Sequence, residues 1–340
     1  MAFSLFPFRL NFKKPFHIAH GVRYYTETVF IKFKHNNITG WGEAALPPYL
    51  IETVESVKQF VNNFNCPTIK NKKDLFNAIS FLHELPNNYA AKAAIETALL
   101  DWYGKRFNQS IFDLLQIPKK NTITSAYTIA ISNAETFIKN IEEAEPYSFL
   151  KIKMGSSFDN EIIDAIAKVI KKPFAVDANQ GWKTKEEAIC KITKLQKAGA
   201  LFVEQPLPIK NIEDQKWLKE NCELPIFADE SFQTINDLES IATLFHGINI
   251  KLIKCGGLVS ALKIIEKAKE LNLEILVGCM SESSCAIKAA AHLAPFANYM
   301  DLDGPLLISN DPFSAFSLNN NIFSFSEKAG LGIEKISEAF

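Results

Sequence analysis

The stretch FAVDANQGW at residues 174–182 begins a pattern that returns twice, as LFVEQP at 201–206 and as IFADES at 226–231. Each copy is a short apolar run that ends in a carboxylate and then becomes polar. Short apolar runs of this kind are typical of the buried strands of a parallel sheet. Amphipathic segments lie between the copies, so the pattern predicts strands that alternate with helices.

The same alternation continues in both directions along the chain. It predicts eight strands, in the runs Thr122–Ile131, Phe149–Met154, Phe174–Asp177, Leu201–Glu204, Ile226–Asp229, Ile248–Ile253, Glu274–Val277 and Tyr299–Asp301. The helical segments between them include Glu161–Ile170, Lys185–Ala198 and Leu258–Leu271. Eight such units in about 190 residues fit a (β/α)8 barrel of the TIM type or a close variant. An open doubly wound sheet is the alternative, but no Gly-rich dinucleotide or phosphate motif favours it.

A hairpin and a group of helices precede these units. Thr28–Lys34 is rich in β-branched and aromatic residues, Asn36-Asn37 offers a tight turn, and Ile38–Glu43 returns. Ala90–Tyr103 combines strong helix formers with apolar residues at helical spacing. We therefore predict three parts: an α+β domain at 1–115, a barrel at 116–310, and a C-terminal segment at 311–340 that returns to the first domain.

Composition excludes several classes of protein. Of 340 residues, 47% are apolar and 22% charged, which excludes a disordered chain. The formal net charge of −1 gives no basic field for nucleic acid or an anionic membrane, so we expect a small-molecule ligand. No apolar run is long enough to cross a bilayer, and Met1–Phe16 does not resemble a signal peptide. The six cysteines form no CxxC pair, so we expect a cytoplasmic protein.

Charged residues occupy the same end of five consecutive predicted strands, where barrel enzymes place their active sites. They recur at intervals of 22 to 27 residues and are Lys153, Asp177, Glu204, Asp229 and Lys251. A single charge at a strand end is usually a solvated loop residue. Five in phase, with apolar residues directly before Glu204 and Asp229, need partners or a metal. We interpret them as a catalytic site.

The three carboxylates of Asp177, Glu204 and Asp229 would converge on one point. Oxygen ligands without a nearby Cys or His at metal spacing suit a hard cation, and we expect one Mg²⁺ per subunit.

Lys153 and Lys251 would face each other across the mouth of the barrel, four strands apart. Lys151 shares a strand face with Lys153, so its charge would lower the pKa of Lys153 and make it a usable base. Lys151 could equally pair with a carboxylate of the ligand. Such a site suits removal of a proton α to a carboxylate, because a metal stabilises the resulting enediolate. The product would be the opposite stereoisomer, or the result of losing a β-leaving group.

These motifs resemble those of the enolase superfamily, in its muconate-lactonizing subgroup, where lysine bases work with Mg²⁺. The matching segments are Lys151–Gly155, Val176–Trp182, Val203–Pro206, Ala228–Ser231, Asn249–Leu252, Gly256-Gly257 and Trp41–Ala44. The resemblance covers essentially the whole chain. It implies a modified TIM barrel with an α+β capping domain formed by the N-terminal part and the C-terminal tail. It also implies that Lys153 and Lys251 are the acid/base pair.

Within that subgroup the chain resembles the dipeptide epimerases, which bind the substrate ammonium with an Asp-x-Asp pair. Here that pair is Asp301 and Asp303, whose carboxylates at i and i+2 can hold one cation. Glu282 matches a glutamate near the second lysine, and we expect it to orient Lys251. Lys254 is a competing base, but we expect it to face elsewhere.

Substrate preference depends on the first mobile loop and on barrel side chains such as Thr128. Relatives that act on Ala-Glu can carry an arginine in this loop, and the corresponding position here is Gly21. Arg23 lies two residues further on and could replace it. Both Ala-Glu and less polar dipeptides therefore remain open as substrates.

The leading hypothesis is a Mg²⁺-dependent dipeptide epimerase that inverts the α-carbon of the C-terminal residue by two-lysine proton transfer. An o-succinylbenzoate synthase is the main alternative, and it would not need the Asp301–Asp303 pair. An acid-sugar dehydratase would use a late histidine, but His292 lies in an Ala-rich helical stretch. A Mg²⁺-binding scaffold without catalysis is the non-enzymatic reading. By analogy with relatives, we expect a homo-oligomer.

Overall fold

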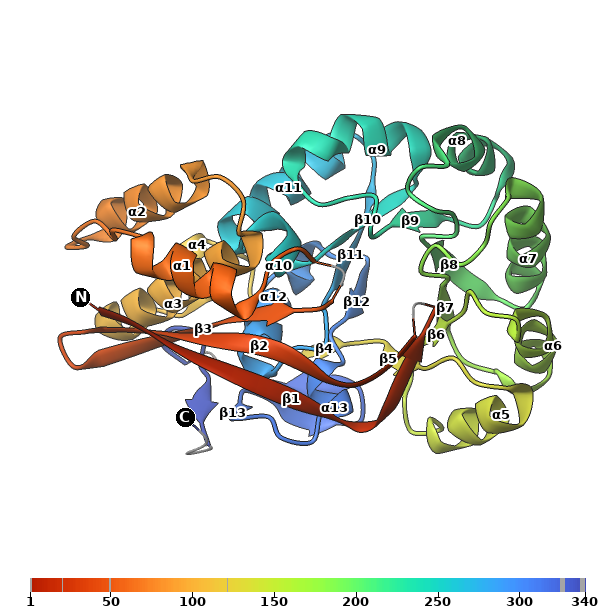
Figure 1. Cartoon of the computed structure of the whole chain (residues 1–340), viewed down its shortest axis with the longest axis horizontal. Coiled ribbons are helices and arrows are strands. Elements are labelled where there is room, and N and C mark those ends of the chain that lie inside the picture. Colours follow the sequence, from red (N-terminus) through yellow and green to blue (C-terminus); the bar gives the residue numbers. More distant parts are fainter. Residues whose placement is uncertain (1, 20, 49, 121, 325–327, 337–339) are drawn as a thin grey trace.

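The structure is a computed structural model that describes residues 2–19, 21–48, 50–120, 122–324, 328–336 and 340. It consists of a barrel with an N-terminal antiparallel capping domain beside it (Figure 1). Within the described ranges, no helix is long and apolar enough to cross a membrane.

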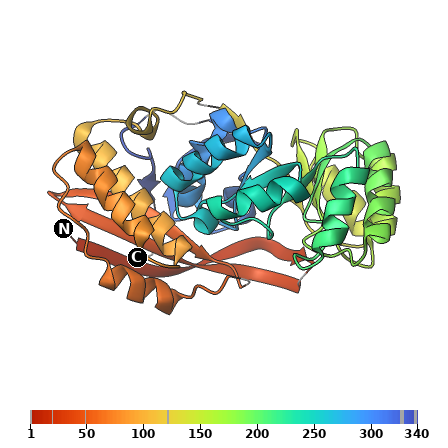
Figure 2. The same ribbon diagram turned by 90° about the horizontal axis from the view of Figure 1, so that it is seen from above.

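The capping domain combines a three-stranded antiparallel sheet with four helices. Its elements are β1 (Ala2–Ile18), β2 (Gly21–His35), β3 (Ile38–Leu46), α1 (Val54–Asn63), α2 (Lys72–Glu84), α3 (Tyr89–Phe107) and α4 (Ile111–Leu115). The predicted hairpin turn is confirmed, because Asn36 and Asn37 join β2 to β3 with φ of 50° and 58°. Figure 2 shows the β1–β2 hairpin extending from the N-terminal helices toward the barrel.

Helix α3 is buried along almost its whole length, between β3 and the barrel. Two glycines of β3 allow this close approach. A Cβ atom at Gly40 would lie 2.0 Å from Ala98 O, and one at Gly42 would lie 1.9 Å from Ala94 O. Any larger residue at either position would push α3 away from the sheet.

The predicted eight-stranded parallel barrel is confirmed. Its strands are β5 (Tyr127–Ile129), β6 (Leu150–Lys153), β7 (Phe174–Asp177), β8 (Ala200–Glu204), β9 (Ile226–Ala228), β10 (Gly247–Ile250), β11 (Glu274–Gly278) and β12 (Tyr299–Asp301). Neighbours in this series pair in sequence order. The barrel is nearly closed, since Ala126 N next to β5 donates to Met300 O of β12 at 2.8 Å.

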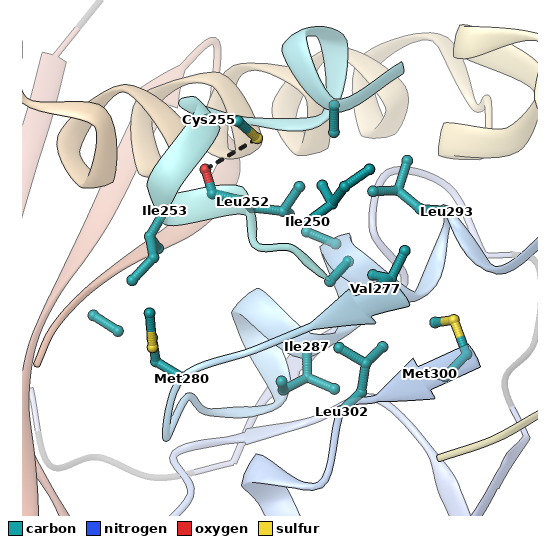
Figure 3. Packing of buried hydrophobic residues seen from close by; sticks show 14 of the residues in the cluster. Ile250, Leu252, Ile253, Cys255, Val277, Met280, Ile287, Leu293, Met300 and Leu302 are labelled. Carbon is teal, nitrogen blue, oxygen red and sulfur yellow. Dashed lines mark hydrogen bonds between the residues drawn. The ribbon is translucent and has the colours of Figure 1, made fainter. Parts of the chain in front are cut away.

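Helices surround the barrel on its outside (Figure 1). They are α5 (Ala134–Glu143), α6 (Asp159–Val169), α7 (Lys185–Lys197), α8 (Ile212–Asn221), α9 (Leu238–Leu244), α10 (Leu252–Cys255), α11 (Leu258–Glu270), α12 (Ser284–Ala291) and α13 (Gly304–Leu307). Short 3-10 turns lie at Ile235–Asp237 and Ala294–Phe296. Figure 3 shows side chains from β10 to β12, among them Ile250, Val277 and Met300, packed with residues of α12 and the turn after it.

Two predicted strands differ from the observed strands by three or more residues at one end. Only Tyr127–Ile129 of the first run belongs to the barrel, because Thr122–Thr124 (β4) pairs instead with β15 (Ile322–Ser324). The run Ile248–Ile253 ends as a strand at Ile250, since residues 252–255 form α10. Its apolar residues suit either state, which explains the error.

The C-terminal segment contributes β13 (Phe313–Ser314), β14 (Ser317–Asn319), β15 and β16 (Glu334–Lys335). The ring of Phe340 packs on Phe30 of β2, with ring centroids 5.0 Å apart, and on Trp41 of β3 at 5.7 Å.

Candidate active site

The three predicted metal ligands meet at the mouth of the barrel. Asp177 and Glu204 end β7 and β8, and Asp229 follows β9 directly. One carboxylate oxygen from each lies within 4.8 Å of the others, and all three residues are buried. Burial and the charge of Asp177 raise the pKa of Glu204 to about 8. Such a buried cluster of carboxylate oxygens fits a hard divalent cation, which would relieve the repulsion among them.

A backbone N–H and a side-chain amide fix two of these carboxylates. Asn179 N donates to Asp177 Oδ1 at 2.9 Å, and Asn249 Nδ2 donates to Glu204 Oε1 at 2.7 Å. The other Glu204 oxygen forms an ion pair with Lys151 Nζ at 2.7 Å and accepts no further hydrogen bond from the described residues. This oxygen therefore has a lone pair available for a cation.

Lys153 and Lys251 lie on opposite sides of this cluster. Lys153 ends β6 and Lys251 directly follows β10, so the two are four strands apart, as the sequence predicts. Lys153 Nζ lies 2.6 Å from Asp177 Oδ2, and Lys251 Nζ lies 2.7 Å from Asp229 Oδ2. Both lysines line one cavity of about 230 Å³. A ligand in this cavity could be approached by an amine from either side.

Lys151 lies deeper, and it is not among the described residues that line this cavity. Its Nζ is 2.7 Å from both Glu204 Oε2 and Asp301 Oδ2. Burial disfavours its charge, but Asp301, Glu204 and Asp177 together raise the pKa of Lys151 well above its usual range. It is therefore a fixed cation that neutralises the carboxylates. The expectation that it makes Lys153 a usable base stays a prediction.

The expectation that Lys254 faces away from the site is wrong. Its Nζ donates to Asp229 Oδ1 and to Asp229 O, both at 2.7 Å, and it lines the cavity. The reason is that residues 252–255 form the helix α10 instead of continuing the strand. One helical turn brings the side chain of Lys254 back toward the site, whereas in a strand it would point to the opposite face.

Asp301 and Asp303 both line the cavity, next to Thr128. Thr128 N donates to Asp303 Oδ2 at 2.8 Å. Asp301 Oδ2 accepts from Lys151, whereas the buried Asp301 Oδ1 has no hydrogen-bond partner among the residues that the structure describes. An unsatisfied buried carboxylate oxygen is costly, and an ammonium group would satisfy it.

Glu282 is buried beside the second lysine. Its Oε2 accepts from Met280 N at 3.0 Å, and Met280 Sδ lies 3.8 Å from Lys251 Nζ. Burial raises the pKa of Glu282 to about 7, and the charge of Lys251 opposes this rise. Glu282 and Lys251 thus interact electrostatically, and the orienting role of Glu282 stays a prediction.

Arg23 lies in β2 and lines the cavity, with its Nη2 donating to Thr26 Oγ1. The cavity wall also includes six apolar residues, Phe16, Ile18, Leu50, Ile209, Met280 and Leu307. Apart from the lysines beside the carboxylate cluster, the cavity therefore offers a ligand side chain the Arg23 guanidinium and apolar contacts.

The sequence reasoning missed several polar residues that support the site. Glu230 lines the cavity, and burial together with the charge of Asp229 raises its pKa to about 7. Gln205 Oε1 accepts from the backbone N of Asp229 and of Ser231, at 3.1 and 3.0 Å. A signal existed for Asn249, which is the one polar residue in an otherwise apolar strand.

Comparison with known proteins adds independent findings. The family profile "Enolase C-terminal domain-like" matches residues 135–339, and "Mandelate racemase / muconate lactonizing enzyme, N-terminal domain" matches residues 4–116. The chain is 38% identical over 338 residues to the L-Ala-D/L-Glu epimerase of Bacteroides thetaiotaomicron, with 99% of this chain and 88% of that protein covered.

Two solved structures are similar throughout. One is a substrate-liganded complex of the L-Ala-D/L-Glu epimerase from Bacillus subtilis, with a TM-score of 0.91, 27% identity and 98% of each chain covered. The other is a dipeptide epimerase from Enterococcus faecalis V583 complexed with Mg and L-Leu-L-Tyr. Its TM-score is 0.90 at 27% identity, with 97% of this chain and 98% of that chain covered.

Proposed function

The chain belongs to the mandelate racemase and muconate lactonizing enzyme family of the enolase superfamily, and on that premise we propose that it is a Mg²⁺-dependent dipeptide epimerase. It would invert the α-carbon of the C-terminal residue. The observation that carries this proposal is the placement of Lys153 and Lys251 on opposite sides of the carboxylate cluster, within one cavity. The dipeptide epimerases among its relatives support the substrate class.

Each part of the site has a role in this reaction. Asp177, Glu204 and Asp229 would hold Mg²⁺, which supplies stabilisation of the negative charge on the substrate carboxylate when its α-proton leaves. One lysine removes that proton, and the other donates a proton to the opposite face. The fixed charge of Lys151 adds to the electrostatic stabilisation.

Asp301 and Asp303 would hold the N-terminal ammonium, which places the C-terminal α-carbon between the two lysines. Assembly as a homo-oligomer and a cytoplasmic location stay predictions, and the proposed chemistry requires neither.

The substrate class can be tested with purified protein, Mg²⁺ and a panel of L-Ala-L-Glu, L-Ala-L-Phe, D-Ala-D-Ala and a cationic dipeptide. We expect at least one member to give a mixture of two diastereomers on chromatography. If no dipeptide changes but the succinylbenzoate precursor is consumed, the lyase reading is correct and the ammonium-binding role of Asp301 and Asp303 is wrong.

Dipeptide binding should depend on pH through Asp303. Burial and the charge of Asp301 raise its pKa to about 7. An ammonium ligand favours the charged carboxylate, so dipeptide affinity should weaken by up to about tenfold per unit as the pH falls below that value. It should also weaken above about pH 8, where the α-amino group of the dipeptide itself loses its proton. Calorimetry across this range measures the effect.

Two controls accompany this titration. With Mg²⁺ kept saturating at every pH, Asp303→Asn should bind weakly across the range, and an N-acetylated dipeptide should show the same weak, pH-independent binding to the wild type. Equal pH dependence for the acetylated and free dipeptides would show that Asp301 and Asp303 do not hold the ammonium.

Arg23 should select acidic side chains. Arg23→Met keeps a similar apolar length but removes the charge, so kcat/KM for L-Ala-L-Glu should fall about tenfold or more. The value for L-Ala-L-Leu should change little, because an uncharged side chain forms no ion pair with Arg23 and can pack on the apolar residues of the wall. An equal fall for both substrates would assign Arg23 a structural role and leave less polar dipeptides as the natural substrates.

A further inference from the structure

Two buried carboxylates of the capping domain reach into the barrel. Glu43 belongs to β3 and Glu96 to α3, and their exposed fractions are 3% and 0%. Each carboxylate accepts a hydrogen bond from a backbone N–H in the first turn of a barrel helix. Glu43 accepts from α12 and Glu96 from α11. These helices follow β11 and β10, so both carboxylates act on the half of the barrel that carries Lys251.

Glu96 holds the turn that follows Lys251. Its Oε1 accepts from Val259 N at 2.9 Å, and its Oε2 lies 2.5 Å from His83 Nε2. The carboxylate also touches the turn itself, since a Cβ at Gly257 would lie 2.5 Å from Glu96 Oε1. Only the short helix α10 separates this turn from Lys251, and α10 packs against α3 (Figure 3). A shift of Glu96 would therefore move the backbone that carries Lys251.

Glu43 binds the loop that precedes α12. It accepts from Ser283 N at 3.1 Å and from Ala286 N at 3.3 Å, and Ser283 Oγ donates to it at 2.5 Å. Ser283 ends the loop that contains Met280 and Glu282. Met280 borders Lys251, as described above, so this loop forms the wall against which Lys251 lies.

The loop after Lys153 is organised by the barrel itself. Asp159 of α6 accepts from Gly155 N at 3.0 Å and Ser156 N at 2.9 Å, and Trp182 Nε1 donates to it at 2.7 Å. The capping hairpin also reaches this loop, where Ala19 lies beside Gly155, but that contact is apolar.

We propose that Glu43 and Glu96 are positioning residues through which the capping domain sets the Lys251 side of the site, while polar contacts within the barrel set the Lys153 side. This inference rests on the proposed function, because it assigns Lys251 one of two half-reactions. It predicts that the two epimers of a substrate depend unequally on the capping domain.

The test compares exchange of the α-proton with D₂O for each of two epimeric dipeptides. The epimer whose exchange disappears in Lys251→Ala is defined as the Lys251 epimer. Glu96→Ala should slow exchange of this epimer about tenfold more than that of the other, because a displacement of about 1 Å can cost 10²-fold. Glu96→Gln should restore the wild-type ratio, since its amide oxygen can still accept from Val259 N.

Glu43→Gln gives a second measurement that does not depend on the folding of Glu96→Ala. Its amide NH₂ would face the Ser283 and Ala286 N–H donors, so the same epimer should be slowed selectively. The matched control is Asp101→Ala. Asp101 is an equally buried carboxylate of α3, but it accepts from Trp41 N and Leu331 N rather than from a barrel loop. Its variant should have a lower Tm and an unchanged exchange ratio.

The outcomes separate the two proposals. Equal slowing of both epimers in Glu43→Gln and Glu96→Ala would overturn the positioning role, as would a changed ratio in the Asp101 control. If the wild type exchanges neither epimer, the proposed function is wrong and this inference falls with it.

Discussion

Lys153→Ala and Lys251→Ala should each abolish epimerisation, with a loss of about 10³-fold or more. Each lysine approaches the cavity from its own side, so each is needed in one direction as the base and in the other as the acid. Each variant should therefore still exchange the α-proton of one epimer, and the two variants should retain opposite epimers. Proton NMR in D₂O, started separately from each epimer, measures this complementary pattern.

A buried lysine outside the site serves as the control. Lys92 of α3 is buried and donates to His83 O at 3.4 Å, and it is not among the described residues that line the cavity. Lys92→Ala should lower the Tm without affecting which epimer exchanges. If both site variants retained the same epimer, a single lysine would serve both faces and the two-base assignment would be wrong.

Removal of the metal should have an effect of similar size. A chelator should abolish activity, and added Mg²⁺ should restore it. Glu204→Gln removes one of the three buried carboxylates, so it should weaken Mg²⁺ binding about 100-fold. Calorimetry with Mg²⁺ alone measures this without any assay of activity.

The pH dependence of Mg²⁺ binding has a definite sign. Glu204 has a pKa of about 8 in the metal-free protein, and it must lose its proton to bind a cation. Mg²⁺ affinity should therefore fall as the pH drops below about 8, and proton release should accompany binding. In Glu204→Gln the affinity should be weak and this part of the pH dependence absent. Mg²⁺ binding of wild-type strength in this variant would show that Glu204 is not a metal ligand.

The sequence was sufficient for the barrel because parallel strands are buried on both faces and therefore stand out as short apolar runs. Charged residues stand out at the ends of such runs, so Asp177, Glu204 and Asp229 could be predicted as metal ligands from the sequence. The positions of Lys153 and Lys251 follow from the order of strands around a ring, and the strand order confirms that geometry.

Local patterns could not place Lys254 or the capping carboxylates. The segment after Ile250 is apolar and suits strand or helix, so the direction of Lys254 depended on which state the tertiary structure selects. Glu43 contacts Ser283 across 240 positions of the sequence, and Glu96 contacts Val259 across 163. No periodicity reports such pairings, although a lone carboxylate within an apolar strand or helix signals that it has a buried partner.

Proton removal and return at the C-terminal α-carbon by two opposed lysines is tested most directly with a single epimer of an active dipeptide in D₂O with Mg²⁺. From the first turnovers, the product epimer should carry deuterium at the α-carbon of its C-terminal residue, and the N-terminal residue should keep its proton. A product that retains its original α-proton, or one labelled at the N-terminal residue, would contradict two-lysine proton transfer at this carbon.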